Sequence, residues 1–414
     1  MTTERDILTA LFEAALAAAL PDGKFAPRLP EPPRGRTIVL GAGKASARMA
    51  RAFEDEWGRP CEGLVVTRYG HACPTRHIEV VEAAHPVPDA AGLAAARRIL
   101  ALAGSAGPDD LVVCLISGGA SALLALPAEG LSLADKQAMN TALLRSGAPI
   151  GVMNMVRKSL SAIKGGRLAA AIAPARAVTY LISDVPGDDP AAIGSGPTVP
   201  DVVDPEAVLA ALAHWGITPS PAVAAVIRAN ALPPRAPSQH DLHMIATPLM
   251  ALEAAAARAR DFGLAPLILG DAIEGEAREA ARVLAGIAAS AADHGLPIAR
   301  PCVLLSGGET TVTVRGRGRG GRNVEFLLAL ALALAGRPGV SALAADTDGI
   351  DGSEDNAGAW FDAGMPEAAR TAGLDLAARL ADNDGYSVFS ALGQLVTTGP
   401  TLTNVNDFRA ILIR

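Results

Sequence analysis

The sequence predicts an α/β protein with mainly parallel sheets. Apolar, β-branched runs end in glycine-rich loops and are followed by helical patterns, as in RTIVLGAG (36–43), LVVCLISGG (111–119) and CVLLSGGETTVTV (302–314). This strand–loop–helix alternation is typical of parallel sheets covered by helices. Because ligands of such sheets bind beyond the carboxyl ends of the strands, the loops after these runs are the first candidates for a functional site.

The length of 414 residues is too great for one hydrophobic core, so we expect two domains. The stretch NALPPRAPSQHD (230–241) interrupts the helical patterns with prolines and polar residues. We therefore predict one domain over 1–238 and a smaller one over 239–414.

The charge and cysteine content exclude several classes of protein. The net charge is −7, so the chain has no general affinity for nucleic acid. Its four cysteines lack paired metal spacing, and Cys114 and Cys302 lie in apolar runs that predict buried free thiols. The cysteine content thus favours a protein of the reducing cytoplasm, and an anionic substrate would need a local basic site.

Two apolar stretches resemble targeting or membrane segments. The first, at the N-terminus, contains Glu4, Asp6 and Glu13, which favour an amphipathic helix over a signal peptide. The second, FLLALALALAG (326–336), is too short to cross a bilayer and predicts a buried helix. We therefore expect no membrane association.

The turn GAGKAS (41–46) follows a predicted strand, where a nucleotide-binding fold holds phosphate. Gly41 and Gly43 match the first two glycines of GxGxxG, but Ser46 stands at the third, and Lys44 lies within the turn. Two readings remain open at this point, an altered dinucleotide fingerprint or a lysine that meets an anion.

Two further glycine loops could cradle phosphate. Glycines let backbone N–H groups approach an anion closely, and a helix N-terminus adds positive potential. Ordinary tight turns are the alternative, and neither loop matches the P-loop pattern. The residues concerned are Ser117, Gly118, Gly119, Ala120 and Ser121 in the first loop, and Gly194, Ser195, Gly196 and Thr198 in the second.

An acidic loop, SDVPGDDP (183–190), follows another apolar strand. Asp184, Asp188 and Asp189 could hold Mg²⁺ against phosphates at the carboxyl end of that strand. The alternative is a solvated turn whose aspartates cap the next helix, which suits Asp189 before Pro190 better than it suits Asp184.

The C-terminal half carries an arginine loop, RGRGRGGRN (315–323). A flexible basic loop before a helix suits the neutralisation of a transferring phosphoryl group. An RGG-type nucleic-acid segment and a mobile surface hairpin are the alternatives. The following ADTDGIDG (345–352) could hold a metal or a hydroxylated substrate, or could be a turn whose aspartates bind their own backbone.

Two remaining features are less specific. Arg157, Lys158, Lys164 and Arg167 form a basic segment that could attract an anionic substrate, although a basic helix face is usually only solvated. His85 lies between an alanine run and two prolines, but no Ser/His/Asp or Cys/His set can be assembled around it.

Together these segments resemble the class II glycerate kinases, the family with a C-terminal MOFRL domain. The resemblance extends along nearly the whole chain. It rests on VLGAGKAS, HPVPDAAG, CLISGGASALL, LLRSGAPI, VRKSLSAIKGGRLA, SDVPGDDPAAIGSGPTVPD, LSGGET, GRGRGGRN, DTDGIDG and TGPTLTNVNDF, in that order.

The resemblance implies ATP- and Mg²⁺-dependent phosphorylation of D-glycerate to 2-phosphoglycerate by a monomer or homodimer. It also implies a Rossmann-like N-terminal domain, a smaller α/β MOFRL domain and an active site in the cleft between them. Lys44 and Arg322 match positions expected to be catalytic. The two glycine loops match the region that binds the nucleotide phosphates. Asp184, together with Asp188 or Asp189, matches the region expected near Mg²⁺. The substrate-binding candidates are Glu309, Asn323 and Asp351.

The chain also departs from the family pattern. It has Val152 where a glutamate is common and Ser159 where a histidine is common. The family property that these two departures put most in question is the substrate preference. The rival function is an NAD(P)H-dependent hydroxypyruvate reductase, which needs the third glycine that Ser46 replaces. A non-catalytic protein that binds a sugar acid or a nucleotide is a second rival.

Overall fold

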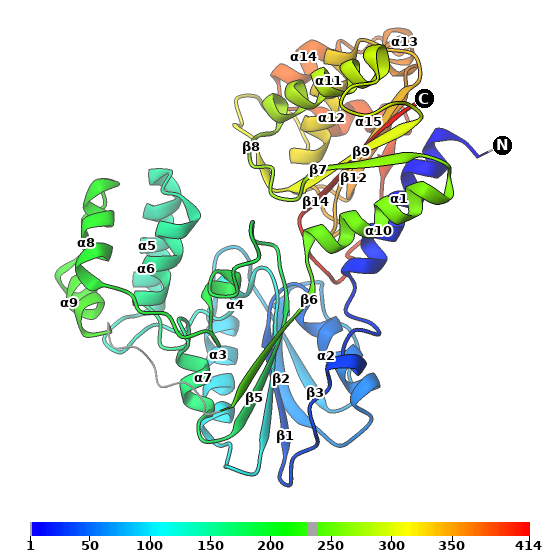
Figure 1. Ribbon diagram of the computed structural model, residues 1–414. Helices are drawn as coiled ribbons and strands as arrows, with labels where there is room; N and C mark the ends of the chain where they lie inside the picture. Colours follow the sequence, from blue (N-terminus) through cyan, green and yellow to red (C-terminus); the bar gives the residue numbers. More distant parts are fainter. Residues whose placement is uncertain (1, 231–238) are drawn as a thin grey trace. The chain divides into compact units, whose positions relative to one another are not determined.

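The computed structural model describes residues 2–230 and 239–414, which form two compact units. The first unit comprises Pro21–Ile245, and the second comprises Met1–Leu20 together with Ala246–Arg414. Each unit contains its own six-stranded sheet (Figure 1). The boundary that the sequence predicts at residue 238 lies outside the described residues.

The sheet of the first unit has the strand order β3-β2-β1-β4-β5-β6, and its β3–β2, β2–β1, β1–β4 and β4–β5 pairs are parallel. This is the order of the Rossmann fold, in which ligands bind where the order reverses, here between β1 and β4. The strands are β1 (Thr37–Ala42), β2 (Glu62–Arg68), β3 (Ile78–Ala83), β4 (Leu111–Ile116), β5 (Arg176–Ile182) and β6 (His240–Ala246).

The helices of the first unit form two groups. One group packs on the sheet, where apolar residues of α3 and α7 bury strand residues such as Ile38 and Leu40. The other group, α5, α6, α8 and α9, shares a separate small core that includes Leu143, Val156 and Leu212 (Figure 1). The helices are η1 (Ala26–Arg28), α2 (Ser46–Trp57), α3 (Ala90–Gly104), α4 (Ala120–Leu123), α5 (Leu133–Ser146), α6 (Ile150–Ser159), α7 (Arg167–Ile172), η2 (Ile193–Ser195), α8 (Pro205–His214) and α9 (Pro221–Ala229).

The main sheet of the second unit is mixed, with the strand order β13-β12-β11-β14-β9-β7. Only its β7–β9 pair, among the pairs that the structure describes, is parallel. The last strand of the chain, β14, lies between β9 and β11 and runs antiparallel to both. The expected parallel arrangement therefore does not hold here, because strand–helix alternation cannot reveal a later strand inserted between two earlier ones. The strands are β7 (Ala265–Gly270), β8 (Gly275–Glu276), β9 (Cys302–Gly308), β10 (Thr310–Thr311), β11 (Val340–Asp346), β12 (Gly358–Phe361), β13 (Leu395–Val396) and β14 (Asp407–Ile413), of which β8 and β10 form a separate two-stranded sheet.

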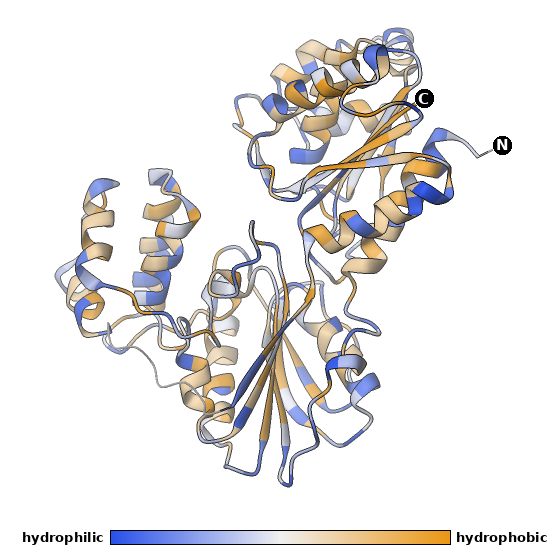
Figure 2. Ribbon diagram, in the orientation of Figure 1, coloured by the Kyte–Doolittle hydropathy of each residue, from blue (hydrophilic) through white to orange (hydrophobic). Residues whose placement is uncertain are grey.

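The helices of the second unit confirm both predictions about apolar stretches. The N-terminal stretch forms the amphipathic helix α1, which packs against α10, and FLLALALALAG lies mostly in the buried helix α12. Figure 2 shows the apolar residues concentrated in the strands and in the helix faces that cover them. The helices are α1 (Glu4–Ala19), α10 (Pro248–Asp261), α11 (Ala277–His294), α12 (Arg322–Leu334), α13 (Met365–Thr371), α14 (Leu376–Ala381) and α15 (Gly385–Ala391).

The structure also bears on the predicted buried cysteines and on membrane-spanning helices. Cys114 and Cys302 are buried free thiols, as predicted. Among residues 2–230 and 239–414, no helix combines the length and the apolar character that a membrane span requires.

Candidate functional site

The turn that contains Lys44 lies at the point where the strand order of the first unit reverses. It follows β1, and the Ser117–Gly119 loop follows the adjacent strand β4. The Lys44 N–H donates to the Gly118 carbonyl at 2.8 Å, and the Ala45 N–H donates to Ser117 Oγ at 3.0 Å. These bonds fasten the two loops together at the carboxyl edge of the sheet, where a Rossmann-like fold binds its ligand.

Gly43 and Gly119 permit this close approach. Gly43 has a φ of 133°, and a Cβ there would overlap Ser117 Oγ. Gly119 has a φ of 80°, and a Cβ there would lie 3.2 Å from His85 Nε2 and 3.3 Å from Lys44 Cγ. The side chains of Lys44 and His85 therefore both lie beside the glycine that precedes α4, which gives His85 a place in the site.

The second glycine loop joins the first through a pair of serines. Ser121 Oγ and Ser195 Oγ are 2.8 Å apart, and Ser195 Oγ donates to Asn154 Oδ1 at 3.1 Å. A Cβ on Gly194 would lie 2.8 Å from that of Ala120. The structure thus brings the two predicted loops into direct contact.

Asn154 is a member of this group that the sequence did not single out. It is buried in α6 and supports the positive-φ residue Ser195 (φ 63°). Its signal was a lone asparagine on the apolar side of a short amphipathic helix, which alone is too weak to identify a functional residue.

The acidic loop begins at the same edge of the sheet, directly after β5. Asp189 acts as a turn residue, because its Oδ1 accepts the Ala191 N–H at 2.9 Å, but it does not cap the next helix, whose N-cap is Ala192. Asp188 has a φ of 53°, a conformation that non-glycine residues adopt uncommonly, and its Oδ1 is buried. Asp184 is half-buried two residues beyond the end of β5, which is itself paired with β4.

The carboxylates of this loop fit a magnesium ion that is held partly by the protein and partly by the phosphates of a substrate. No group of three or more His, Cys, Asp or Glu is arranged for a metal in residues 2–230 and 239–414. Mg²⁺ in phosphoryl-transfer sites, however, is usually held by one or two carboxylates together with substrate phosphates and water. Asp184 and Asp188, which lie in the same loop, are the carboxylates that could meet this smaller requirement.

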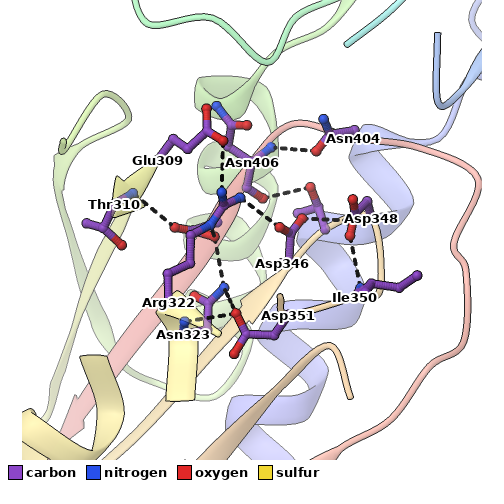
Figure 3. Close-up of polar contacts among 12 residues, drawn as sticks. Glu309, Thr310, Arg322, Asn323, Asp346, Asp348, Ile350, Asp351, Asn404 and Asn406 are labelled. Carbon is purple, nitrogen blue, oxygen red and sulfur yellow. Dashed lines mark hydrogen bonds and ion pairs between the residues drawn. The ribbon is translucent and has the colours of Figure 1, made fainter. Parts of the chain in front are cut away.

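In the second unit, Arg322 is surrounded by carboxylates (Figure 3). Its Nε donates to Asp407 Oδ1 at 2.7 Å, its Nη2 to Asp346 Oδ2 at 2.7 Å, and its Nη1 to Glu309 Oε1 at 2.8 Å. Burial alone would lower the pKa of this guanidinium, but the three carboxylates raise it above its ordinary value. Arg322 is therefore a permanently charged group held in one orientation.

Arg322 occupies the first position of α12, and Asp351 caps that helix from a distant loop. Asp351 is fully buried and accepts the N–H groups of Asn323 at 3.0 Å and Val324 at 2.9 Å. Burial raises the pKa of Asp351 to about 6, although the two N–H donors act in the opposite direction. The two oxygens of Asp351 are thus used to fix the helix start that carries Arg322.

Asp407 connects these groups to the sheet. One of its oxygens accepts Asn323 Nδ2 at 2.8 Å as well as Arg322, and the other accepts Arg409 Nη2 at 2.5 Å. Arg409 is 1% exposed and also donates to Thr310 Oγ1 at 2.9 Å. The sequence singled out neither Asp407 nor Arg409, because a buried arginine in an apolar strand is recognised only from its partners.

The aspartates of DTDGIDG form the turn that was one of the alternatives, and one of them also binds Arg322. Asp346 Oδ1 accepts the Asp348 N–H at 3.0 Å, and Asp348 Oδ1 accepts the Ile350 N–H at 2.9 Å, so the loop satisfies its own backbone. At the same time Asp346 Oδ2 binds Arg322. The loop is therefore a structured turn that also orients the arginine.

The arginine loop before α12 is held by its backbone. The N–H groups of Arg315 and Gly316 donate to Asn383 Oδ1, and that of Arg317 donates to Asp382 Oδ1. A Cβ on Gly316 would overlap the backbone of Asp382. The alternation of arginine and glycine thus lets this loop lie directly on residues 382–384. The loop that we expected to be flexible is therefore held in place by hydrogen bonds.

Comparison with known proteins identifies the family. A family model described as "Domain of unknown function (DUF4147)" matches residues 7–228, and the MOFRL family model matches residues 302–407. A protein of Agrobacterium vitis named "Putative hydroxypyruvate reductase" is 55% identical over 99% of this chain and 94% of its own length. A D-glycerate 2-kinase of Thermotoga maritima is 39% identical over 96% of this chain and 95% of its own.

The fold leads to the same group of proteins. A crystal structure of a glycerate kinase from Thermotoga maritima superimposes with a TM-score of 0.89 at 39% identity, covering 98% of this chain and 99% of that one. At this identity and coverage the similarity extends to both units. The chain belongs to the glycerate kinase family that combines a DUF4147 domain with a MOFRL domain.

Proposed function

We propose that this protein transfers the γ-phosphoryl group of ATP to D-glycerate and forms 2-phosphoglycerate. The observation that carries the nucleotide part is that the Lys44 turn contacts the Ser117–Ser121 loop where the strand order reverses, and that this loop in turn contacts the Gly194–Thr198 loop. The whole-chain similarity to glycerate 2-kinases supports the choice of acceptor.

Residues of the first unit supply the nucleotide site in this proposal. Gly119 has a positive φ, precedes α4 and lies beside the Lys44 side chain, so its loop offers backbone that phosphate oxygens can approach together with a cation. Asp184 and Asp188 would hold Mg²⁺, with Asp189 shaping their turn. When bound, the ion supplies charge neutralisation and orientation of the phosphates.

Residues of the second unit supply the arginine and the groups that orient it. We propose Arg322 as the second catalytic cation, because phosphoryl transfer depends mainly on positioning and on neutralisation of charge. Glu309 is its most exposed partner, with 49% of its side chain accessible, so this pair is the one that a substrate can exchange most easily. The buried Asn323 and Asp351 then act as positioning residues near the substrate region.

A specific contact argues against the reductase. In a dinucleotide fold the N–H groups at the start of the helix after β1 bind the pyrophosphate. Here the N–H groups of Lys44 and Ala45 already donate to the Ser117–Gly118 loop. Ser46, at the position of the third glycine, donates its hydroxyl to the carbonyls of Gly43 and Val66 at 2.9 and 2.8 Å.

The experiment is a direct comparison of the two reactions. ATP consumption with D-glycerate is measured beside NADH and NADPH oxidation with hydroxypyruvate, and phosphorus NMR identifies the phosphorylated carbon. We expect 2-phosphoglycerate and no reduced-cofactor oxidation. Reductase turnover without phosphorylation would overturn the proposal, and ATP binding without product would favour a non-catalytic binding protein.

Lys44→Ala tests the proposed catalytic lysine. We expect a large fall in kcat with little change in Tm, because an added cation at the phosphate loops acts on the transferring group. Arg51→Ala, on the exposed side of α2, is the matched control and should leave turnover unchanged. Near-normal turnover of the Lys44 variant would remove this residue from the mechanism.

We further propose that the protein works in the cytoplasm on small molecules, as a monomer or homodimer and without nucleic acid. The net charge of −7 supports the last point. Size-exclusion chromatography with light scattering measures the oligomeric state.

A further inference from the structure

Four cations of the first unit come together in a group that the proposed reaction does not use. This basic cluster comprises Lys136 of α5, Arg157 of α6, and Lys164 and Arg167 at the start of α7. Lys164 is 1% exposed, and the other three are partly buried. The cluster is therefore not the solvated helix face that the sequence left as the simplest alternative.

Neutral oxygens accept hydrogen bonds from both lysines. Lys164 Nζ donates to the Leu124 carbonyl, and Lys136 Nζ donates to the Leu160 carbonyl at 3.3 Å. A carbonyl dipole satisfies one hydrogen of an ammonium group but does not neutralise its charge.

The two arginines are bound in the same way. Arg157 donates through Nε and Nη2 to Asn140 Oδ1, at 3.2 and 2.7 Å. Arg167 donates to the carbonyls of Lys164 at 3.0 Å and Asn230 at 2.5 Å. Each guanidinium is thus held in place by a neutral acceptor.

No carboxylate in residues 2–230 and 239–414 forms an ion pair with any of the four cations. Residues 231–238, ALPPRAPS, contain no Asp or Glu, so no side chain of that segment can supply one. The adjacent Lys158 provides the contrast, since its Nζ lies 2.5 Å from Asp201 Oδ2. The neighbouring lysine thus has the counter-charge that the cluster lacks.

Burial without a counter-ion is costly for such groups. Burial, followed by the charges of Arg157 and Arg167, lowers the pKa of Lys136 to about 7. Burial, followed by the charges of Lys136 and Arg157, holds the pKa of Lys164 well below its ordinary value. A bound anion would relieve both effects.

The cluster is attached to both glycine loops of the proposed nucleotide site. Leu124, which accepts from Lys164, ends the short helix that begins after Gly119. The N–H groups of Gly165 and Gly166 donate to the carbonyls of Ser195 and Gly196, at 3.1 and 2.8 Å. An anion on the cluster would thus bind next to those loops, on side chains other than Lys44.

We propose that the basic cluster of Lys136, Arg157, Lys164 and Arg167 is a binding site for a phosphate-class anion. Two guanidinium groups offer paired N–H donors that match phosphate oxygens, and two ammonium groups add further charge. Four cations without a carboxylate suit a dianion better than the single charge of a carboxylate. Inorganic phosphate and a phosphorylated metabolite share this chemistry. The possibility that the bound anion comes from a metabolite rests on the proposed kinase function.

The test measures thermal unfolding of the full-length protein in chloride buffer at constant ionic strength. Inorganic phosphate, 2-phosphoglycerate and ADP are titrated in separate arms. We expect phosphate at about 100 times its Kd to raise Tm by roughly 5 °C. Lys136→Met and Lys164→Met should abolish this rise, whereas Lys44→Met should keep it.

Arg145→Gln is the matched control, because Arg145 lies in the exposed last turn of α5 and its replacement removes one positive charge from the helix that carries Lys136. It should keep the phosphate-dependent rise. A larger rise with 2-phosphoglycerate or ADP that Lys136→Met also abolishes identifies a metabolite as the source, and an equal rise identifies free phosphate.

Two outcomes would overturn the proposal. One is a wild-type Tm that phosphate raises no more than chloride at equal ionic strength. The other is an equal phosphate-dependent rise in wild type and Lys136→Met. These results are independent of the phosphorylation assay, so failure of this proposal is distinguishable from failure of the proposed function.

Discussion

Arg322 and the basic cluster are two opposite ways of burying positive charge in one protein. Around Arg322, three carboxylates face one guanidinium at 2.7–2.8 Å. In the basic cluster, the partners of the four cations among the described residues are carbonyl and amide oxygens. Arg322 thus has its counter-charges within the protein, whereas the cluster has no carboxylate partner in the part of the chain that the structure describes.

The two arrangements differ in whether the protein mainly orients the cation or leaves it able to attract an anion. Carboxylates hold Arg322 in one geometry but also offset its charge, so it can meet a phosphoryl group only by exchanging a partner. The cluster has no carboxylate partner among the described residues, and burial lowers the pKa of its two lysines, so a bound anion would restore their protonated forms. A catalytic cation must be held in one orientation, whereas a cation that binds an anion must not already be paired with a carboxylate. The two regions meet these two requirements separately.

The largest expected effect is on catalysis by Arg322. Arg322→Ala should lower kcat by about 10³-fold or more, since arginines that stabilise transferring phosphoryl groups contribute effects of this size. The measurement is steady-state ATP-dependent phosphorylation of D-glycerate. Arg317→Ala, in the same loop but bonded through its backbone N–H, is the control and should retain turnover. Equal losses in both variants would contradict the special role of Arg322.

The next effect concerns stability and has opposite signs in the two regions. Arg409→Met leaves Asp407 as a buried charge short of a partner and should lower the free energy of unfolding by about 3–5 kcal/mol. Lys164→Met removes an uncompensated buried cation and should leave stability unchanged or raise it in phosphate-free buffer. Urea unfolding measures both, and a large loss in the lysine variant would break the comparison.

A smaller effect follows from the pKa of Asp351, which burial raises to about 6. The folded state then holds this proton more tightly than the unfolded state. The contribution to stability is therefore complete below about pH 4 and is lost as pH rises through 6. The stability difference between wild type and Asp351→Asn should accordingly shrink by on the order of 2 kcal/mol from pH 4 to pH 7.

The control for this trend is Asp375→Asn. Asp375 also caps a helix through two N–H groups, those of Ala377 and Ala378 at 3.0 Å, but it is exposed. Tm measured across the pH series should show the trend for Asp351 alone. The same trend in both variants would show that burial is not its cause.

The smallest effect is expected at Glu309, the exposed carboxylate beside Arg322. Glu309→Gln should change the free energy of unfolding by less than about 1 kcal/mol, because exposed ion pairs contribute little. If this pair is exchanged for substrate, KM for D-glycerate should change more than stability does. Thermal unfolding and steady-state kinetics on the same preparation check both parts.

Much of the site could be predicted because it lies in loops directly after strands. Lys44, Ser117 and Asp184 each follow a recognisable apolar run, and parallel strands bring such loops to one edge of a sheet. The family resemblance, confirmed by the MOFRL match, added the acceptor and the position of Arg322. The assignment of individual site residues stays a prediction for the experiments above.

Other members could not be predicted, because their partners are distant in the sequence. Arg409 lies in an apolar strand and binds Thr310, 99 positions away. Asn154 binds Ser195, 41 positions away. Asp351 resembles a metal or turn residue in DTDGIDG, yet it caps a helix that begins 29 residues earlier. Local patterns carry no information about such pairings.

Local sequence patterns were enough to predict the α/β class, the amphipathic first helix, the buried helix α12, the glycine loops after β1 and β4, and the family. These features depend on local periodicity and turn chemistry, which neighbouring residues set. The fold was needed to show that β14 separates β9 from β11, that carboxylates enclose Arg322, and that four cations gather with no carboxylate partner among the described residues. Strand insertion and charge compensation depend on which distant segments meet, and that is settled by packing the whole chain.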